Sequence, residues 1–174
     1  MDATTIMPSA EVLAVLEVLR SHRLDAWLAG GWAVDALLAE QTRPHGDLDL
    51  AIRAEHVDPA VVALEARGYR RMLDLLPVRL VLAAPDGRRL DLHPVTFDRA
   101  GVGHQPGDDG RVFEYPADAF GEGKIDGQSV ACLSAVQLVR FHLGYEPRSR
   151  DVVDMALLRD RLGVEVPAEY FLGD

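Results

Sequence analysis

The stretch at residues 27–52, WLAGGWAVDALLAEQTRPHGDLDLAI, constrains the fold of this chain more than any other. A short apolar run at residues 27–29 meets two adjacent glycines, and a helical pattern of apolar residues follows at once. After a loop, residues 47–52 read as a second strand. Successive strand residues point to opposite faces, so Asp47 and Asp49 share one face while the apolar residues share the other. The sequence therefore predicts a strand, glycine pair and helix beside a strand that carries two carboxylates.

This arrangement favours a site for a metal-bound nucleotide. Two hard oxygen donors at this spacing suit Mg²⁺, and paired glycines before a helix N-terminus suit phosphate. Each half of the signal is weak by itself, because Asp-x-Asp triplets arise by chance and a Gly-Gly pair often marks only a tight turn. The order of strand, glycines, helix and acidic strand makes the combination specific.

The same order of features resembles the nucleotidyltransferase superfamily of the DNA polymerase beta type. More narrowly, GGWAVDALL followed by TRPHGDLDL is similar to the antibiotic nucleotidyltransferases, the lincosamide enzymes most of all and the aminoglycoside 2''-nucleotidyltransferases more distantly. The resemblance continues through LDLHP at residues 90–94 and FHLGY at residues 141–145, so it covers most of the chain. Gly46 departs from the pattern, because these enzymes usually carry a charged residue there.

Alternation in the LDLHP run places Asp91 and His93 on the polar face of a strand. If that strand pairs beside the Asp47 strand, Asp91 can reach the same metal site. For His93, a role at the site and a role as a hydrogen-bonded partner are equally supported.

The resemblance implies a role for each site residue. The expected catalytic and metal-binding residues are Asp47, Asp49 and Asp91. The expected nucleotide-binding residues are Gly30, Gly31, Arg43, His45 and Arg79. The weaker candidates for contact with an acceptor are His93, His142 and Tyr145, and for the last two a packing role is equally supported. Whether Asp91 accepts a proton or only binds metal is left open.

The implied reaction is transfer of a nucleoside monophosphate, AMP from ATP as first choice, to a hydroxyl of a lincosamide-like or aminoglycoside-like antibiotic, with release of pyrophosphate. Two Mg²⁺ ions are expected, with ATP or another NTP as co-substrate. Two alternatives stay open. One is an antitoxin-type nucleotidyltransferase that modifies a partner protein, and the other is a non-catalytic nucleotide-binding protein.

The composition limits the kinds of partner that the chain is expected to bind. The net charge of −10 and the pI near 5.0 argue against a nucleic-acid surface and suit a small cationic acceptor. The single cysteine, Cys132, lies in an apolar run, so we expect it in the core of a protein from a reducing cytoplasm. We find no signal-peptide pattern at the N-terminus and no apolar stretch long enough for a membrane span. Association into homodimers is left open.

The expected fold class is α/β (α+β): a small mixed sheet flanked by helices, similar to the polymerase beta-like nucleotidyltransferase fold. We expect a core at residues 1–133 and a C-terminal helical portion at residues 134–174. Residues 77–84 and 88–95 predict a hairpin around Pro85-Asp86-Gly87. Residues 98–111, rich in Gly and Asp, predict a loop. We expect Asp58 to cap one helix and a capping box at residues 134–137 to open another.

Overall fold

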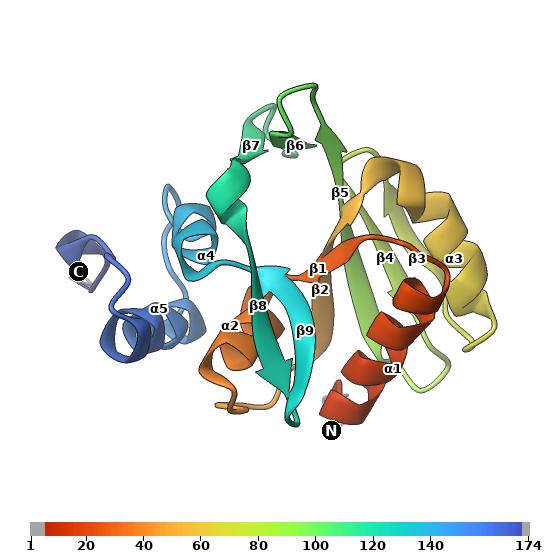
Figure 1. Ribbon diagram of the computed structural model, residues 1–174, viewed down its shortest axis with the longest axis horizontal. Helices are drawn as coiled ribbons and strands as arrows, with labels where there is room; N and C mark the ends of the chain where they lie inside the picture. The colour runs from red at the N-terminus through yellow and green to blue at the C-terminus, as the bar shows by residue number, and fades with distance from the viewer. Residues whose placement is uncertain (1–5, 172–174) are drawn as a thin grey trace.

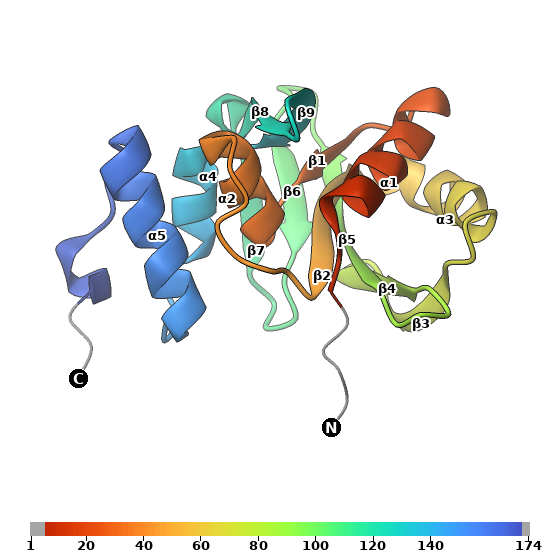
Figure 2. The same ribbon diagram turned by 90° about the horizontal axis from the view of Figure 1, so that it is seen from below.

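A mixed β-sheet runs through the centre of the molecule, with helices on either side of it (Figures 1 and 2). This computed structural model describes residues 6–171. Residues 1–5 and 172–174, at the ends of the predicted core and of the predicted helical portion, lie outside the described residues. None of the helices within residues 6–171 is long and apolar enough to cross a membrane.

The strands are β1 (Ala26–Leu28), β2 (Asp47–Arg53), β3 (Arg70–Leu75), β4 (Arg79–Ala83), β5 (Arg89–Phe97), β6 (Gly103–Pro106), β7 (Val112–Tyr115), β8 (Phe120–Ile125) and β9 (Gln128–Leu133). The helices are α1 (Ser9–Ser21), α2 (Gly30–Leu38), α3 (Val57–Glu65), α4 (Ala135–Phe141) and α5 (Ser149–Leu162). The main sheet has the order β3-β4-β5-β2-β1-β9-β8, and β6 and β7 extend from β5 as a ribbon. Because β2–β5 and β1–β9 are parallel and the other pairs antiparallel, the expected mixed α/β fold is confirmed.

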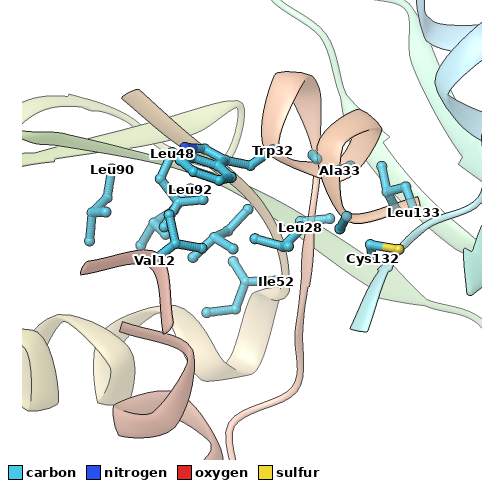
Figure 3. Packing of buried hydrophobic residues seen from close by; sticks show 14 of the residues in the cluster. Val12, Leu28, Trp32, Ala33, Leu48, Ile52, Leu90, Leu92, Cys132 and Leu133 are labelled. Carbon is cyan, nitrogen blue, oxygen red and sulfur yellow. The ribbon is translucent and has the colours of Figure 1, made fainter. Parts of the chain in front are cut away.

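The apolar face of β2 forms the middle of the core. Leu48, Leu50 and Ile52 are fully buried, and Leu90 and Leu92 continue the same face on β5. Figure 3 shows this layer beside Val12 of α1, with Cys132 buried at its far end as expected. Burial of this face leaves the alternate residues of β2 and β5 on the opposite face, where the acidic side chains lie.

Three local predictions need correction. Residues 98–111 are not only a loop, since they contain β6, in which Gly103 packs against Val95 and Tyr115. Pairing with β5 and β7 overrides the low strand propensity of Gly and Pro there.

Asp58 does not cap α3, because a 3₁₀ turn at Ala54–His56 leads into the helix and the cap position is His56. 

At the start of α4, the capping box predicted at residues 134–137 is half formed. Ser134 does accept a hydrogen bond from the backbone N–H of Gln137. The Gln137 side chain does not complete the box, because it donates instead to the backbone carbonyl of Glu114. That bond ties α4 to β7, which places the helix beside the ribbon.

A buried charge cluster fastens α1 to the end of α3 and to the sheet. The Glu11 carboxylate accepts hydrogen bonds from Arg67 Nη2 (2.7 Å) and from the Tyr69 hydroxyl (3.0 Å), and Arg88 Nη1 lies 2.8 Å from it. Burial acts to raise the pKa of Glu11, but the bonds from Arg67 and Tyr69 and the charges of Arg67 and Arg88 outweigh it and lower the pKa.

We predict that Glu11→Gln lowers the free energy of unfolding by about 1.5–3 kcal/mol at neutral pH, because charge-assisted hydrogen bonds are lost. Since folding lowers the pKa of Glu11, its contribution is full above the ordinary carboxyl pKa and is lost as the pH falls through the folded value. The difference between the two proteins in urea denaturation should therefore shrink at acidic pH.

The matched control is Glu17→Gln on the same helix, where the carboxylate forms an exposed pair with Arg20. This variant should be as stable as the wild type, because exposed pairs contribute little. If Glu11→Gln, like the control, were as stable as the wild type at neutral pH, this would contradict a stabilising role for the buried cluster.

Candidate active site

Parallel pairing of β2 with β5 brings the predicted carboxylates together. The register sets Asp49 beside Asp91, as expected from the sequence if the two strands were neighbours. His93 Nε2 lies 3.4 Å from Asp49 Oδ1 and 3.8 Å from Asp91 Oδ1. One ligand atom from each of these three side chains lies within 4.8 Å of the other two, which is close enough to hold one metal ion.

Asp47 lies outside this compact group. Its side chain is exposed at the edge of the same cavity, two residues before Asp49 on the same face of β2. The group that the structure brings closest therefore has His93 where the sequence predicted Asp47. A role for Asp47 in metal binding stays a prediction.

The acidic group is electrostatically frustrated in the absence of a cation. Burial, and then the charges of Asp49 and Asp47, raise the pKa of Asp91 against the opposing charges of His93 and Arg79. Asp91 Oδ1 is buried and has no hydrogen-bond partner among the described residues. Although Asp47 is exposed at one side, desolvation by the surrounding protein and the charge of Asp49 likewise raise its pKa. An unpaired buried carboxylate oxygen beside a second carboxylate fits a bound cation.

At His93 the same neighbouring carboxylates favour the charged form of the side chain. Burial acts to lower the pKa of this imidazole, but the hydrogen bond and charge of Asp49, with the charge of Asp91, raise it above its ordinary value. The ring is thus held against both carboxylates.

The glycine pair at the start of α2 makes room for site side chains. Gly30 has φ +55°, and a Cβ there would lie 2.3 Å from Asp49 Oδ2. A Cβ on Gly31 would lie 2.5 Å from the ring of His45 and 2.6 Å from Arg43 Nη2. The two glycines therefore let a carboxylate, an imidazole and a guanidinium group approach the backbone at the helix N-terminus.

Arg43 and His45 are already engaged. Arg43 donates two hydrogen bonds to Asp154 of α5, at 3.2 and 2.7 Å. His45 is buried, with Nε2 hydrogen-bonded to Asp35 of α2 and its ring against Trp32. Both residues line the cavity above the carboxylates. As the side chains stand, they fix the loop before β2, and contact with a triphosphate stays a prediction for each.

Two adjoining cavities meet at Asp49. A polar cavity of about 320 Å³ is lined by every predicted nucleotide-binding residue and, in addition, by Arg148 and Arg150. An apolar one of about 250 Å³ is walled by aromatic rings of Phe113, Tyr115 and Phe141. The residues shared by the two linings are Gly30, Asp49, His93 and His142. A larger cavity of about 690 Å³ between α1 and β9 contains none of the predicted site residues.

The remaining predicted residues lie around this junction at different distances. Arg79 Nη1 lies 3.4 Å from Asp91 Oδ2, and its Nε is buried without a partner among the described residues. His142 donates from Nδ1 to the carbonyl of Leu138 (2.7 Å), and its Nε2 lies 3.9 Å from Asp151 Oδ1 in the lining of the polar cavity. Tyr145 is 42% exposed and, within residues 6–171, belongs to the lining of neither cavity.

Sequence reasoning missed three polar residues of the site. Arg148 and Arg150 stand at the start of α5, whose N-terminus faces the polar cavity, and Gln105 lies on β6 inside the predicted loop. The pair of arginines flanking a helix start was a usable signal, since both charges and the helix dipole favour anions. Gln105 had no signal, because its position depends on the pairing of β6.

Comparison with known proteins agrees with this geometry. The sequence profile of the family described as aminoglycoside-2''-adenylyltransferase matches residues 11–158. A lincosamide resistance protein from Staphylococcus haemolyticus is 29% identical over 149 residues, covering 86% of this chain and 92% of that protein. A 2''-aminoglycoside nucleotidyltransferase from Escherichia coli is 35% identical over 75 residues, covering 43% of this chain and 41% of that protein.

A solved structure extends the similarity to the whole fold. The crystal structure of the lincosamide antibiotic adenylyltransferase LnuA, lincomycin-bound, superposes with a TM-score of 0.80 at 28% identity, covering 90% of this chain and 99% of that one. The covered part of this chain exceeds the strands that carry the carboxylates, so the likeness is not limited to a local motif.

We predict that Gly30→Ala destabilises the protein and abolishes metal-dependent nucleotide binding. The new methyl group would meet Asp49 Oδ2 and would also force a positive φ on alanine, which costs about 1–2 kcal/mol by itself. Urea denaturation would give the stability, and calorimetry with Mg-ATP would give the affinity.

Gly127→Ala separates the two effects. Gly127 has φ +78° in the β8–β9 turn, and a Cβ there meets nothing within 4 Å. This control should show the backbone cost alone and bind nucleotide normally. Equal losses of stability and equal nucleotide affinity in the two variants would contradict a special role for the Gly30–Asp49 contact.

Proposed function

This chain belongs to the aminoglycoside-2''-adenylyltransferase family and is a nucleotidyltransferase, and on that premise we propose that it transfers AMP from Mg-ATP to a hydroxyl of a lincosamide-like antibiotic, releasing pyrophosphate. The observation that carries the proposal is the position of Asp49 where the polar cavity meets the apolar one, with Asp91 beside it in the lining of the polar cavity. A nucleotide in the first and an acceptor in the second would meet at the carboxylates.

The polar cavity suits the triphosphate. Arg148, Arg150 and Arg79 line it with side chains that are at least partly exposed, and the N-termini of α2 and α5 face it. Guanidinium groups and helix N-termini both favour phosphate oxygens. The Arg43–Asp154 pair would act mainly by holding α5, and with it Arg150, at the edge of the cavity.

Asp49 and Asp91 would hold Mg²⁺, with Asp47 as a further ligand at the cavity edge. Asp91 Oδ1, which is buried and accepts no hydrogen bond from the described residues, supports a cation at this place. When bound, Mg²⁺ supplies positive charge to the attacking and leaving oxygens of the transfer, and the family pattern implies two such ions.

Asp91 is also placed to handle the proton of the acceptor hydroxyl. It comes from a different strand than Asp49, and its pKa is raised by burial and by neighbouring carboxylates. A carboxylate with a raised pKa is a better proton acceptor than a fully solvated one. In this scheme Asp91 orients the hydroxyl and takes its proton, while Arg79 stabilises the charged form from the other side.

The apolar cavity indicates the acceptor. The rings of Tyr115 and Phe141 lie 5.1 Å apart and those of Phe113 and Phe141 5.6 Å apart, both in edge-to-face geometry. Such walls bind an apolar group of a small molecule better than a ring bearing several protonated amines. This supports a lincosamide-like acceptor over an aminoglycoside-like one, and a small molecule over a segment of a partner protein. Homodimer formation and a cytoplasmic location stay predictions.

A mass-shift assay tests the function directly. We expect one AMP to be added to a lincosamide in the presence of Mg-ATP, and little or no addition to aminoglycosides. Absence of product with both drug classes, with ATP and GTP each tried, would contradict the proposed reaction. Product with aminoglycosides alone would overturn only the acceptor class.

Substitution of the carboxylates separates their roles. Asp49→Asn should lose Mg-ATP affinity and turnover together, because Asp49 lies at the junction of both cavities. Of the two expected ions, Asp91 would touch mainly the catalytic one and the attacking hydroxyl, so Asp91→Asn should bind Mg-ATP nearly normally while turnover falls on the order of 10² or more, the effect of a positioned base. Calorimetry beside single-turnover rates distinguishes the two. Asp126→Asn in the exposed β8–β9 turn is the control and should match the wild type. An Asp91→Asn protein that keeps its single-turnover rate would show that Asp91 takes no part in the reaction.

A further inference from the structure

We propose that Asp151 is a positioning residue of the polar cavity: its carboxylate holds the Arg148 guanidinium in place to bind phosphate oxygens of the nucleotide. Asp151 Oδ2 accepts a hydrogen bond from the backbone N–H of Arg148 (2.9 Å) and another from Arg148 Nε (3.1 Å). Both residues line the polar cavity. The role in nucleotide binding rests on the proposed function, whereas the contact between the two side chains does not.

The two side chains of this pair differ in exposure. The Asp151 side chain is 4% exposed, and the Arg148 side chain is 63% exposed. An anion that enters the polar cavity therefore meets the guanidinium rather than the carboxylate. The bond to Asp151 uses Nε, which is one of the five N–H donors of a guanidinium, so the group keeps its capacity to bind phosphate oxygens.

The surroundings of Asp151 keep its carboxylate ionised. Burial acts to raise its pKa, but the hydrogen bonds from the backbone and side chain of Arg148, with the charges of Arg148 and His142, outweigh burial and lower the pKa. The bond from Arg148 Nε is therefore a charge-assisted one, and such bonds are about twice as strong as neutral ones.

Asp151 also fastens the chain segment that joins the two cavities. Residues 142–148 lead from α4, which carries Phe141 of the apolar cavity, to α5, and the two helices lie side by side (Figure 2). Asp151 ties the last residue of this segment, Arg148, to the first turn of α5. A long side chain that is fixed before binding loses less conformational freedom when it binds an anion.

Helix capping is the competing explanation for Asp151. It is the third residue of α5, where an acidic side chain can cap the helix through the backbone N–H of the residue before the first turn. If capping were its whole function, its loss would loosen residues 142–148 and weaken binding in both cavities. If Asp151 acts through the Arg148 side chain, its loss should weaken nucleotide binding alone.

The test compares Mg-ATP affinity, measured by calorimetry, in the wild type, Asp151→Asn, Arg148→Met and the double variant. Asparagine keeps the size and an oxygen that can accept the Arg148 backbone N–H, but it removes the charge. We expect Asp151→Asn to weaken Mg-ATP binding about 10-fold, within the range of coupling between residues of one hydrogen-bonded network. In the Arg148→Met background the same change should have little further effect, because the group that Asp151 positions is absent.

Two results would overturn the proposal. One is Mg-ATP affinity in Asp151→Asn that equals the wild type or exceeds it, since tighter binding would mean that the carboxylate only repels phosphate. The other is a full further loss in the double variant, because Asp151 would then act independently of Arg148. Asp160→Asn, in the exposed last turn of α5, is the matched control and should bind like the wild type.

Kinetics in the adenylylation assay separates positioning from capping. In Asp151→Asn the KM for ATP should rise about 10-fold, in line with the affinity, while the KM for the lincosamide stays at the wild-type value. A rise of both KM values together would show that Asp151 is only a helix cap.

A second variant covers the case in which Asp151→Asn does not fold. Arg148→Lys keeps the positive charge but lacks the planar fork that can bond Asp151 and phosphate together, so it should also weaken Mg-ATP binding about 10-fold. Unchanged affinity in Arg148→Lys would overturn the proposal. A wild type that does not bind Mg-ATP would contradict the proposed function and this inference with it, whereas normal binding by the variants would contradict this inference alone.

Discussion

The parallel pairing of β2 with β5 is the interaction on which the rest of the structure depends. Each strand alternates, so burial of the leucines on one face necessarily presents Asp49 and Asp91 on the other. A shift of the register by one residue would move the acidic side chains into the core. The free energy gained by burying the apolar face therefore also holds two carboxylates side by side, which repel each other until a cation is bound.

The helices and the loop around the site hold its charged side chains close together. Two contacts hold the loop before β2 in place. The Asp35–His45 hydrogen bond connects it to α2, and the Arg43–Asp154 ion pair connects it to α5. The glycines of α2 accept the close approach of these side chains. The Gly-Gly pair, for which we propose phosphate binding, is thus a site of close side-chain packing, and the proposed role is compatible with it because both need a backbone without a Cβ.

The C-terminal helices and the β6–β7 ribbon convert this centre into a site with two compartments. Helix α5 closes the polar cavity with charged residues, whereas α4 and β7 close the apolar cavity with aromatic rings. Both compartments share His93 and His142, so an acceptor and a nucleotide would be bound by some of the same side chains. The predicted division at residue 133 places these helices in a separate portion, yet their function would be to complete the site of the core.

By itself, the sequence determined the features that follow from local periodicity. Alternation gave the acidic and apolar faces of β2 and β5, the Gly-Gly pair marked the start of α2, and the turn residues placed the β4–β5 hairpin. Only the tertiary structure decided which side chains at those positions meet. It drew His93 rather than Asp47 into the compact group, engaged Arg43 and His45 with acidic partners, and brought Gln105 to the site. The physical reason is that local patterns fix the direction in which a side chain points, whereas its partners come from strands and helices far along the chain, whose pairing no local pattern specifies.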